Sequence, residues 1–190
     1  MGRKRGPSLT REQVVQAAVE LVRAEGAEAL GVSRVASALN IKPPSIYNHV
    51  GTGDALARAV VLQANRELVD VLKNTVRGVH EPSGQLRGLA DATRSWALDN
   101  RGLYALMARV KPDNDDPAFI PVYRDLLDLF GRPLGQLGVP DDEIIHAIRG
   151  VRAGIHGFVL LDSSGQFQFE VSTEESYHWL VDTLIAGVLR

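Results

Sequence analysis

The sequence predicts an all-α protein, because three features recur along its 190 residues. Apolar residues return every three or four positions, which places them on one face of a helix. Residues that favour helix ends, such as Thr10 and Gly26, stand at the borders of these stretches. No stretch alternates apolar and polar residues over a useful length, as a half-buried strand would.

The first helix is predicted to begin after Thr10. Its hydroxyl can accept the N–H of Gln13 while the Gln13 side chain reaches back, which is a capping box. Apolar residues from Val14 to Val22 share one face, and Gly26 can adopt the left-handed C′ conformation that ends the helix.

Two short helices follow, in the order and spacing of a helix-turn-helix pattern. Ser33 is expected to be the N-cap of the second helix, and Asn40 to stop it. Pro43 and Pro44 begin the third, since proline is tolerated in the first turn, where its missing N–H has no intrahelical partner.

Gly51 is expected to close the third helix, and Thr52 to cap a long fourth one. Beyond residue 77, loops at "GVHEPSG" and "KPDNDDP" separate further helices. Asp116 and Pro117 are predicted as the cap and first residue of one of them. The last two helices are predicted over about 141–161 and 173–190, from their helical periodicity and start signals.

The first of these two last helices carries two stripes. Large side chains recur with the spacing 4, 3, 4, 3 at Ile144, Ile148, Val151, Ile155 and Phe158. Beside them lie Gly150, Gly154 and Gly157, and glycine inside a helix costs about 1 kcal/mol relative to alanine. The glycines therefore indicate close approach, either of a second copy of the chain or of a ligand.

Composition excludes several classes of protein. The chain has no cysteine, which rules out disulfides and thiolate metal sites and favours a reducing compartment such as the cytoplasm. It contains no unbroken run of about 18 apolar residues and no secretory signal at its start, so no membrane segment is expected.

Charge is unevenly placed along the chain. Residues 1–50 hold seven Lys or Arg and four Asp or Glu, a net +3, so the remainder must carry −5 to give the total of −2. This asymmetry is typical of a protein whose N-terminal part alone meets nucleic acid, although a solvated basic tail explains it equally well.

An enzyme is not expected. The five histidines form no H-E-x-x-H motif, and the chain has no G-x-S-x-G, no phosphate-binding glycine loop and no cysteine nucleophile. "DNDDP" fails the calcium-loop pattern because proline occupies a ligand position. No catalytic residue, metal site or cofactor is therefore predicted.

The stretch from Thr10 to Leu56, with "VSRVASALNIKPPSIYNHV" followed by "GTGDAL", resembles the TetR family of transcriptional regulators. Near the C-terminus, "AGIHGFVLLDSSGQF" and "EESYHWLVDTLIAGVL" resemble the subgroup with a Trp-His-Gly signature, although only His156 and Gly157 of that signature are present. The resemblance implies a homodimer that binds a palindromic double-stranded operator DNA and releases it when a small molecule binds.

The resemblance also implies four parts of the chain: a basic arm at 1–8, a helix-turn-helix DNA-binding domain at 9–53, a connecting helix at 54–77, and a C-terminal ligand-binding and dimerisation domain at 78–190. An architectural or nonspecific DNA-binding protein is the alternative, which the acidic C-terminal part disfavours.

Residues expected at DNA follow from the family's positions and from the charge of the N-terminal part. They are Arg3, Lys4, Arg5, Ser33, Arg34, Lys42, Pro44, Ser45, Tyr47, Asn48, His49 and Thr52. Two residues depart from the family: Lys42 stands where a hydroxyl cap is usual, and Gly53 where a Lys is usual. Tyr47 could instead be a core aromatic residue, and His49 is expected to be the more exposed of the two.

Aromatic and apolar residues of the C-terminal part are expected to line a pocket for a small, apolar or aromatic inducer, or else to be simple core. They are Trp96, Leu103, Tyr104, Met107, Phe119, Tyr123 and His156. The last two helices are expected to pair across a two-fold axis as a four-helix bundle. The residues predicted at this interface are Ile148, Val151, Ile155, Phe158, Leu180, Leu184 and Val188.

Overall fold

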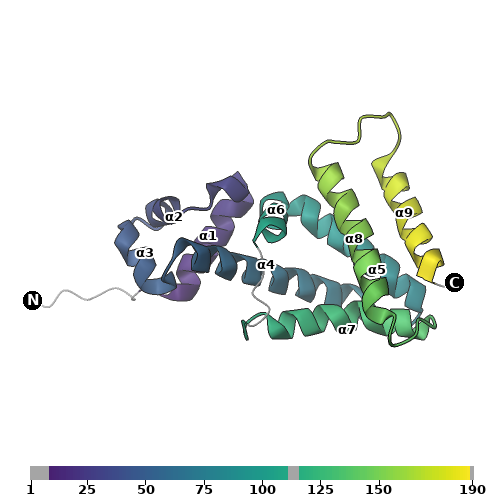
Figure 1. Cartoon of the computed structure of the whole chain (residues 1–190). Helices are drawn as coiled ribbons and strands as arrows, with labels where there is room; N and C mark the ends of the chain where they lie inside the picture. The colour runs from purple at the N-terminus through teal and green to yellow at the C-terminus, as the bar shows by residue number, and fades with distance from the viewer. Residues whose placement is uncertain (1–8, 111–115, 189–190) are drawn as a thin grey trace, which may run out of the picture. The chain divides into compact units, whose positions relative to one another are not determined.

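The computed structural model describes residues 9–110 and 116–188, and all regular structure within them is helical. The chain divides into two compact units (Figure 1). The N-terminal unit comprises Met1–Ala64 and Arg101–Pro112, and the C-terminal unit comprises Asn65–Asn100 and Asp113–Arg190. The predicted all-α fold is thus confirmed.

Helix α1 (Arg11–Glu25) begins as the sequence predicts. The Gln13 N–H donates to Thr10 Oγ1 at 3.2 Å, and the Thr10 N–H donates to Gln13 Oε1 at 2.9 Å. Gly26 ends α1 with a φ of +89° and a ψ of 170°, so the positive φ is present but the predicted left-handed helical conformation is not. The short 3-10 helix η1 (Ala27–Ala29) follows directly.

Helices α2 (Val32–Ala38) and α3 (Pro43–Val50) form the helix-turn-helix. Asn40 stops α2 with a φ of +53°, as predicted. The predicted N-cap of α2 was wrong: Gly31 holds that position, and Ser33 lies in the first turn.

The apolar sides of α1, α2 and α3 meet in the core of the N-terminal unit. Val14, Val22, Val35 and Ile46 have no solvent-exposed surface. Helix α6 (Arg101–Arg109) completes this unit by packing on α1. A Cβ on Gly102 would lie 2.3 Å from the Val22 carbonyl oxygen, so only glycine permits the approach seen here.

Helix α4 (Gly53–Thr75) runs from the N-terminal unit into the C-terminal unit. The C-terminal unit contains α5 (Pro82–Asp99), α7 (Ile120–Gln136), α8 (Ile144–Ser163) and α9 (Thr173–Val188). Helices α8 and α9 lie side by side and antiparallel, joined by one loop (Figure 1).

Two predicted helix starts in this unit were wrong by about one turn. Asp116 accepts the N–H of Ala118 on its Oδ1 and caps a turn, so α7 begins only at Ile120. A turn over residues 141–143 likewise precedes α8, which begins at Ile144. Pro133 lies inside α7, which continues to Gln136.

A polar network links three helices of the C-terminal unit. The buried Tyr177 hydroxyl on α9 donates to the Ala90 carbonyl on α5 at 2.6 Å. Arg94 of α5 pairs with Asp162 of α8 at 2.9 Å, and its guanidinium lies 5.1 Å from the centre of the Tyr177 ring. The two charged side chains are only 17% and 15% exposed.

Candidate nucleic-acid interface and ligand-binding region

Helix α3 presents one buried and one exposed face. Ile46 and Val50 anchor it in the core of the N-terminal unit. Tyr47 is 49% exposed and Asn48 is also exposed, so the alternative of a core aromatic at position 47 is excluded. A helix held by one face and polar on the other is suited to enter a DNA groove.

The start of α3 is set by its two prolines and not by a side-chain cap. Pro43 and Pro44 occupy its first two positions, as predicted. Lys42 is the N-cap residue, its side chain makes no cap hydrogen bond, and it is exposed. No ion pair of Lys42 is found among the described residues, so its ammonium group is available to a phosphate.

His49 departs from the prediction, because it is half-buried and Tyr47 is the more exposed residue. His49 lies three residues after Ile46 and directly before Val50, at the edge of the buried stripe. Ser45 is also half-buried, whereas Pro44 is exposed. The exposed surface of α3 is therefore centred on Pro44, Tyr47 and Asn48.

Thr52 caps α4, as predicted. Its Oγ1 accepts the N–H of Ala55 at 3.0 Å, and its side chain is on the surface. Gly53, which follows it, is the exposed first residue of α4. The hydroxyl hydrogen of Thr52 remains available as a donor, since the cap uses only the oxygen lone pair.

Ser33 and Arg34 lie on the exposed side of α2. Arg34 forms an ion pair with Glu25, in which both side chains are about half exposed. Such a surface pair is worth less than about 1 kcal/mol, so it would not prevent Arg34 from turning to a phosphate. Arg3, Lys4 and Arg5 lie outside the described residues.

The residues predicted to line a pocket fall in both units. Leu103 and Tyr104 are buried and Met107 is half-buried on α6, in the N-terminal unit. Trp96, Phe119, Tyr123 and His156 belong to the C-terminal unit. Among these, Phe119 and Tyr123 are in contact, with ring centroids 5.7 Å apart.

Arg152, which the sequence analysis did not select, joins Tyr123 and His156 electrostatically. Burial raises the pKa of the Tyr123 hydroxyl, with Arg152 opposing this effect and Asp116 adding to it. Burial lowers the pKa of His156, and the positive charge of Arg152 lowers it further. The spacing of Arg152 and His156, one turn apart on α8, was the signal that could have identified this group.

The described part of the C-terminal unit carries surface hollows, two of which contain none of the predicted pocket residues in their lining. One, of about 410 Å³, is lined by Lys73, Val76, Gln85, Asp125, Asp128, Leu129, Arg132 and Gln136. The other, of about 430 Å³, is the α7–α8 groove, lined by Leu127, Asp128, Gly131, Arg132, Gly135, Asp141, Ile144, Ile145 and Ile148. Within the described residues, no group of three or more His, Asp or Glu is placed to hold a metal ion.

The predicted dimer residues on α8 need correction. Ile148, Val151 and Ile155 are at most 8% exposed, because they face the interior of their own unit. Phe158, Leu180, Leu184 and Val188 are half-buried. Gly154 allows Leu184 of α9 to lie against α8, so this glycine serves packing within one chain.

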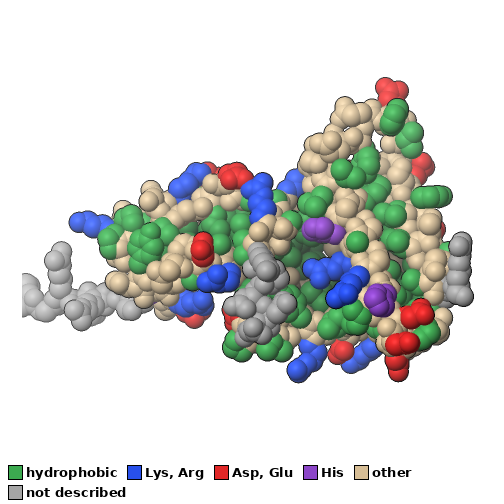
Figure 2. Space-filling model, viewed as in Figure 1, with side chains coloured by type: hydrophobic (Ala, Val, Ile, Leu, Met, Phe, Trp, Pro, Cys, Tyr) green, Lys and Arg blue, Asp and Glu red, His purple; other side chains and the backbone are tan. Residues whose placement is uncertain are grey.

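The opposite side of α8 remains uncovered. Gly150, Ala153 and Leu161 lie there and are exposed, and Trp179 of α9 is also exposed. Helix α8 is long and apolar enough to cross a membrane by length and composition alone, with a mean hydropathy of 1.3, although it contains Arg149 and Arg152. Only 22% of that segment is buried, and Figure 2 shows hydrophobic side chains on the surface of α8 and α9.

Comparison with known proteins identifies both units. Residues 14–60 match the family model of bacterial regulatory proteins of the tetR family, and residues 86–184 match the tetracyclin repressor-like C-terminal domain. These matches name no Trp-His-Gly subgroup, so that finer assignment stays a prediction.

Two relatives are transcriptional regulators. The uncharacterized HTH-type regulator Rv0681 of Mycobacterium tuberculosis is 28% identical over 186 residues, covering 98% of this chain and 84% of the relative. The HTH-type transcriptional repressor DrrR1 of Streptomyces coeruleorubidus is 29% identical over 146 residues, covering 75% of this chain and 49% of the relative.

Solved structures share the fold. A TetR protein from Acinetobacter baumannii AYE in complex with minocycline superposes with a TM-score of 0.74, at 22% identity, covering 95% of this chain and 96% of that one. ActR of Streptomyces coelicolor in complex with (S)-DNPA gives a TM-score of 0.70, at 19% identity, covering 96% and 98%. With its exposed helix-turn-helix and both family models matched, the chain belongs to the TetR family of bacterial transcriptional regulators.

Proposed function

We propose that this chain is a cytoplasmic transcriptional repressor that binds a palindromic operator as a homodimer and is released from it by a small molecule. One observation carries the proposal most directly: α3 is anchored by Ile46 and Val50 and exposes Tyr47 and Asn48. Such a helix can enter the major groove without disturbing the core of its own unit.

The DNA-facing residues divide into two groups by chemistry. Lys42, Tyr47 and Thr52 carry donors suited to phosphate oxygens, and they position the protein on the duplex. Ser45 and Asn48 carry hydrogen-bonding groups suited to base edges, which specify sequence. Ser33 and Arg34 at the start of α2 add phosphate contacts at the flank of the site.

The homodimer is formed by the uncovered sides of α8 and α9 and not by the buried stripe. Gly150, Ala153 and Leu161 on α8 and Trp179 on α9 are exposed in the single chain. Small residues on α8 would permit close helix approach, and burying Leu161 and Trp179 would remove apolar surface from water. A two-fold axis would then present two α3 helices to half-sites about 34 Å apart.

The inducer binds near Phe119, Tyr123 and His156. The stacked rings supply an apolar wall, and Arg152 adds a positive charge beside it. A small apolar or aromatic molecule fits this composition. By linkage, an inducer that weakens operator binding must itself be bound more weakly, by the same factor, when the operator is present.

The first test concerns DNA binding, because the operator sequence can be identified before the inducer is known. Selection of bound duplexes from a random pool is expected to yield an inverted repeat, bound about 10³-fold or more tightly than unrelated DNA at physiological salt. Equal affinity for all sequences would contradict the proposal and would favour an architectural DNA-binding protein.

The matched variant is Tyr47→Ala, with Tyr123→Ala as the control that removes the same side chain from the C-terminal unit. The α3 variant should lose operator binding while the control retains it.

Small molecules that raise the melting temperature of the wild-type protein are then tested for release of the selected DNA. A hit whose stabilisation persists in Tyr123→Ala and His156→Ala would place the inducer elsewhere.

A further inference from the structure

Helix α3 carries Asn48 at the centre of its exposed face. Ile46 and Val50 hold the helix in the core of the N-terminal unit, with 0% and 7% of their surface exposed. Asn48 lies two residues from each of them, and two residues at about 100° per residue place a side chain about 160° from its neighbour around the helix axis. Asn48 therefore points away from both core residues, and it is exposed.

The fold does not explain why an asparagine stands at this position. Asparagine is among the weaker helix formers, because its side chain competes for backbone groups and so favours caps and turns. Asn48 is not a cap of α3, since Lys42 and Gly51 hold those positions. Its side chain makes no hydrogen bond within the described chain. Both polar atoms of the amide are therefore available to a partner.

The other polar side chains of α3 differ from Asn48 in position or in chemistry. Ser45 and His49 are half-buried, and Tyr47 carries a single hydroxyl. Pro44, one turn before Asn48 on the same face, is exposed but has no hydrogen-bonding side chain. The helix contains no Arg, Lys, Gln, Asp or Glu. Within α3, which the structure describes completely, Asn48 is thus the one exposed side chain with a donor and an acceptor side by side.

This pair of groups matches one base edge in the major groove. Adenine presents a donor, its N6 amino group, beside an acceptor, N7, whereas guanine presents two acceptors. Cytosine offers a donor, and thymine offers an acceptor with a methyl group. An asparagine amide can donate from Nδ2 to N7 and accept from N6 on Oδ1 at the same time. Adenine alone therefore satisfies both groups of the amide.

We propose that Asn48 reads an adenine in each half-site of the operator through this pair of hydrogen bonds. The inference rests on the proposed operator binding and adds which base the helix selects. Because α3 and its two-fold copy face the two half-sites in the same way, the adenine recurs at the symmetric position of the inverted repeat. Tyr47, about 100° around the helix from Asn48, keeps its hydroxyl for a phosphate, so one helix both positions the protein and specifies a base.

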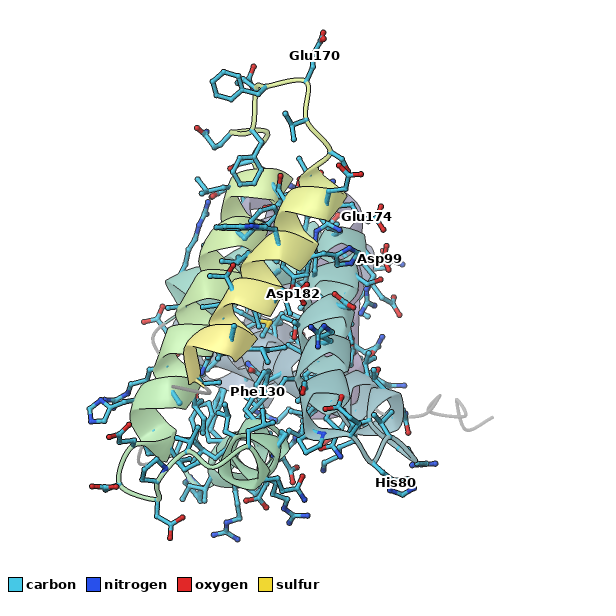
Figure 3. All side chains as sticks on the ribbon, turned by 90° about the vertical axis from the view of Figure 1, so that its right-hand side faces the viewer. His80, Asp99, Phe130, Glu170, Glu174 and Asp182 are labelled. Carbon is cyan, nitrogen blue, oxygen red and sulfur yellow. The ribbon has the colours of Figure 1, made fainter. Side chains whose placement is uncertain are left out.

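The charge of the C-terminal unit supports the assignment of DNA contact to α3. The net charge is +3 over residues 1–50 and −5 over the rest of the chain. Figure 3 shows Asp99, Glu170, Glu174 and Asp182 at the surface of the C-terminal unit, where their carboxylates repel DNA phosphates. A substitution on the surface of that unit therefore serves as a control for changes on α3.

The experiment uses the full-length protein and the operator that selection from a random pool yields. Each adenine of the half-site is replaced in turn, in both half-sites, by 7-deazaadenine, which has a C–H group in place of N7 and keeps its Watson–Crick pairing. At one position the wild-type protein is expected to lose about tenfold or more in affinity, as for the loss of a bidentate base contact. Asn48→Ala should bind the unmodified operator about tenfold or more weakly, and should distinguish the two DNAs by less than about twofold.

Two control variants separate base reading from other effects. Asn74→Ala removes another exposed asparagine, from α4 in the C-terminal unit, and should change affinity by less than about twofold. Tyr47→Phe should weaken binding to all sequences alike and keep the sensitivity to 7-deazaadenine. The urea midpoint of Asn48→Ala should not fall, because alanine is the stronger helix former. A weaker affinity of this variant then does not come from misfolding.

The possible outcomes distinguish this inference from the proposed function. If no adenine of the operator requires its N7, or if Asn48→Ala keeps the discrimination, the adenine assignment is wrong while specific operator binding stands. An equal loss of affinity for every sequence in Asn48→Ala would assign Asn48 to a phosphate and would also overturn it. If the wild-type protein prefers no sequence, the proposed function itself is contradicted.

Discussion

Gly154 of α8 lies directly against Leu184 of α9. A Cβ added at Gly154 would be 2.8 Å from Leu184 Cδ1 and 3.3 Å from Cδ2. At Gly150 and Gly157, by contrast, an added Cβ would meet nothing within 4 Å. One glycine of the stripe is thus explained by packing within the chain, and the other two remain open to a second copy.

Gly154→Leu is expected to lower the free energy of unfolding by about 1 to 3 kcal/mol, because the new side chain would overpack the contact between α8 and α9. Gly154→Ala should be much milder, since the atom it meets is the end of a side chain that can rotate. Urea unfolding of the two variants measures the difference. An unchanged midpoint for Gly154→Leu would show that α9 does not lie this close to α8.

Arg94→Ala is expected to destabilise the protein by about 2 to 3 kcal/mol. It would leave the largely buried carboxylate of Asp162 without its partner and would remove the cation–π contact with Tyr177. Arg87→Ala is the matched control on α5, because Arg87 pairs with Asp182 at the surface, where both side chains are about half exposed. Arg87→Ala should lower the free energy of unfolding by less than about 1 kcal/mol. Urea unfolding measures both variants, and equal losses of stability would mean that burial of the Arg94–Asp162 pair is unimportant.

Lys42→Ala is expected to weaken operator binding by a similar factor for all sequences. Removing one phosphate contact should also reduce the slope of log K against log salt by about 1. Binding titrations at several salt concentrations measure this slope. Arg124→Ala, which removes an exposed positive charge from α7, is the control and should leave the slope unchanged; an unchanged slope for Lys42→Ala itself would remove Lys42 from the interface.

Tyr47→Phe is expected to reduce operator affinity about fivefold, because a net hydrogen bond to a phosphate contributes about 1 kcal/mol. Stability should not change, since the ring is half exposed and its hydroxyl has no partner in the described structure. Affinity and urea midpoint are compared with those of the wild-type protein. A loss of stability without a loss of affinity would give Tyr47 a structural role.

Stability should fall as pH is lowered from 7.5 to 5.5, in part because of His156. Its pKa in the folded state lies below the ordinary value of 6.5, so the unfolded chain binds the proton more readily in this range. The stability that the neutral form of His156 contributes is fully present above pH 6.5 and is lost as pH falls through the folded-state pKa. Urea unfolding at both pH values should show a smaller loss in His156→Gln; an equal loss would assign the pH dependence to other groups.

The N-terminal unit was largely predictable because its signals are local. Thr10, Pro43, Gly51 and Thr52 each act on backbone groups within a few residues, so their effects do not depend on the rest of the fold. The predicted starts of α7 and α8 are wrong because a local signal for chain reversal can belong either to a turn or to the start of a helix. Turn-forming residues at 116–119 and 141–143 make a separate turn first, and the sequence does not distinguish such a turn from a helix start.

Contacts between distant segments were not predictable. The spacing of Ile148, Val151 and Ile155 shows that they share a face, but only packing decides whether that face meets its own chain or a partner. Likewise, α6 packs on α1 and on η1, which lie about 80 residues earlier in the chain, and the ion pair between Arg109 of α6 and Glu28 of η1 illustrates this long separation. Nothing in the local sequence of α6 indicates this contact.

The place of α6 in the N-terminal unit determines when that unit can finish folding during synthesis. Residues 1–64 leave the ribosome first, but α6, which covers α1, follows only after α5 has been made. At about 5 to 20 residues per second, the nascent helix-turn-helix must wait several seconds for its last helix. A truncated protein ending at residue 64 would expose the side of α1 that α6 covers, so an isolated DNA-binding fragment should aggregate or remain partly folded.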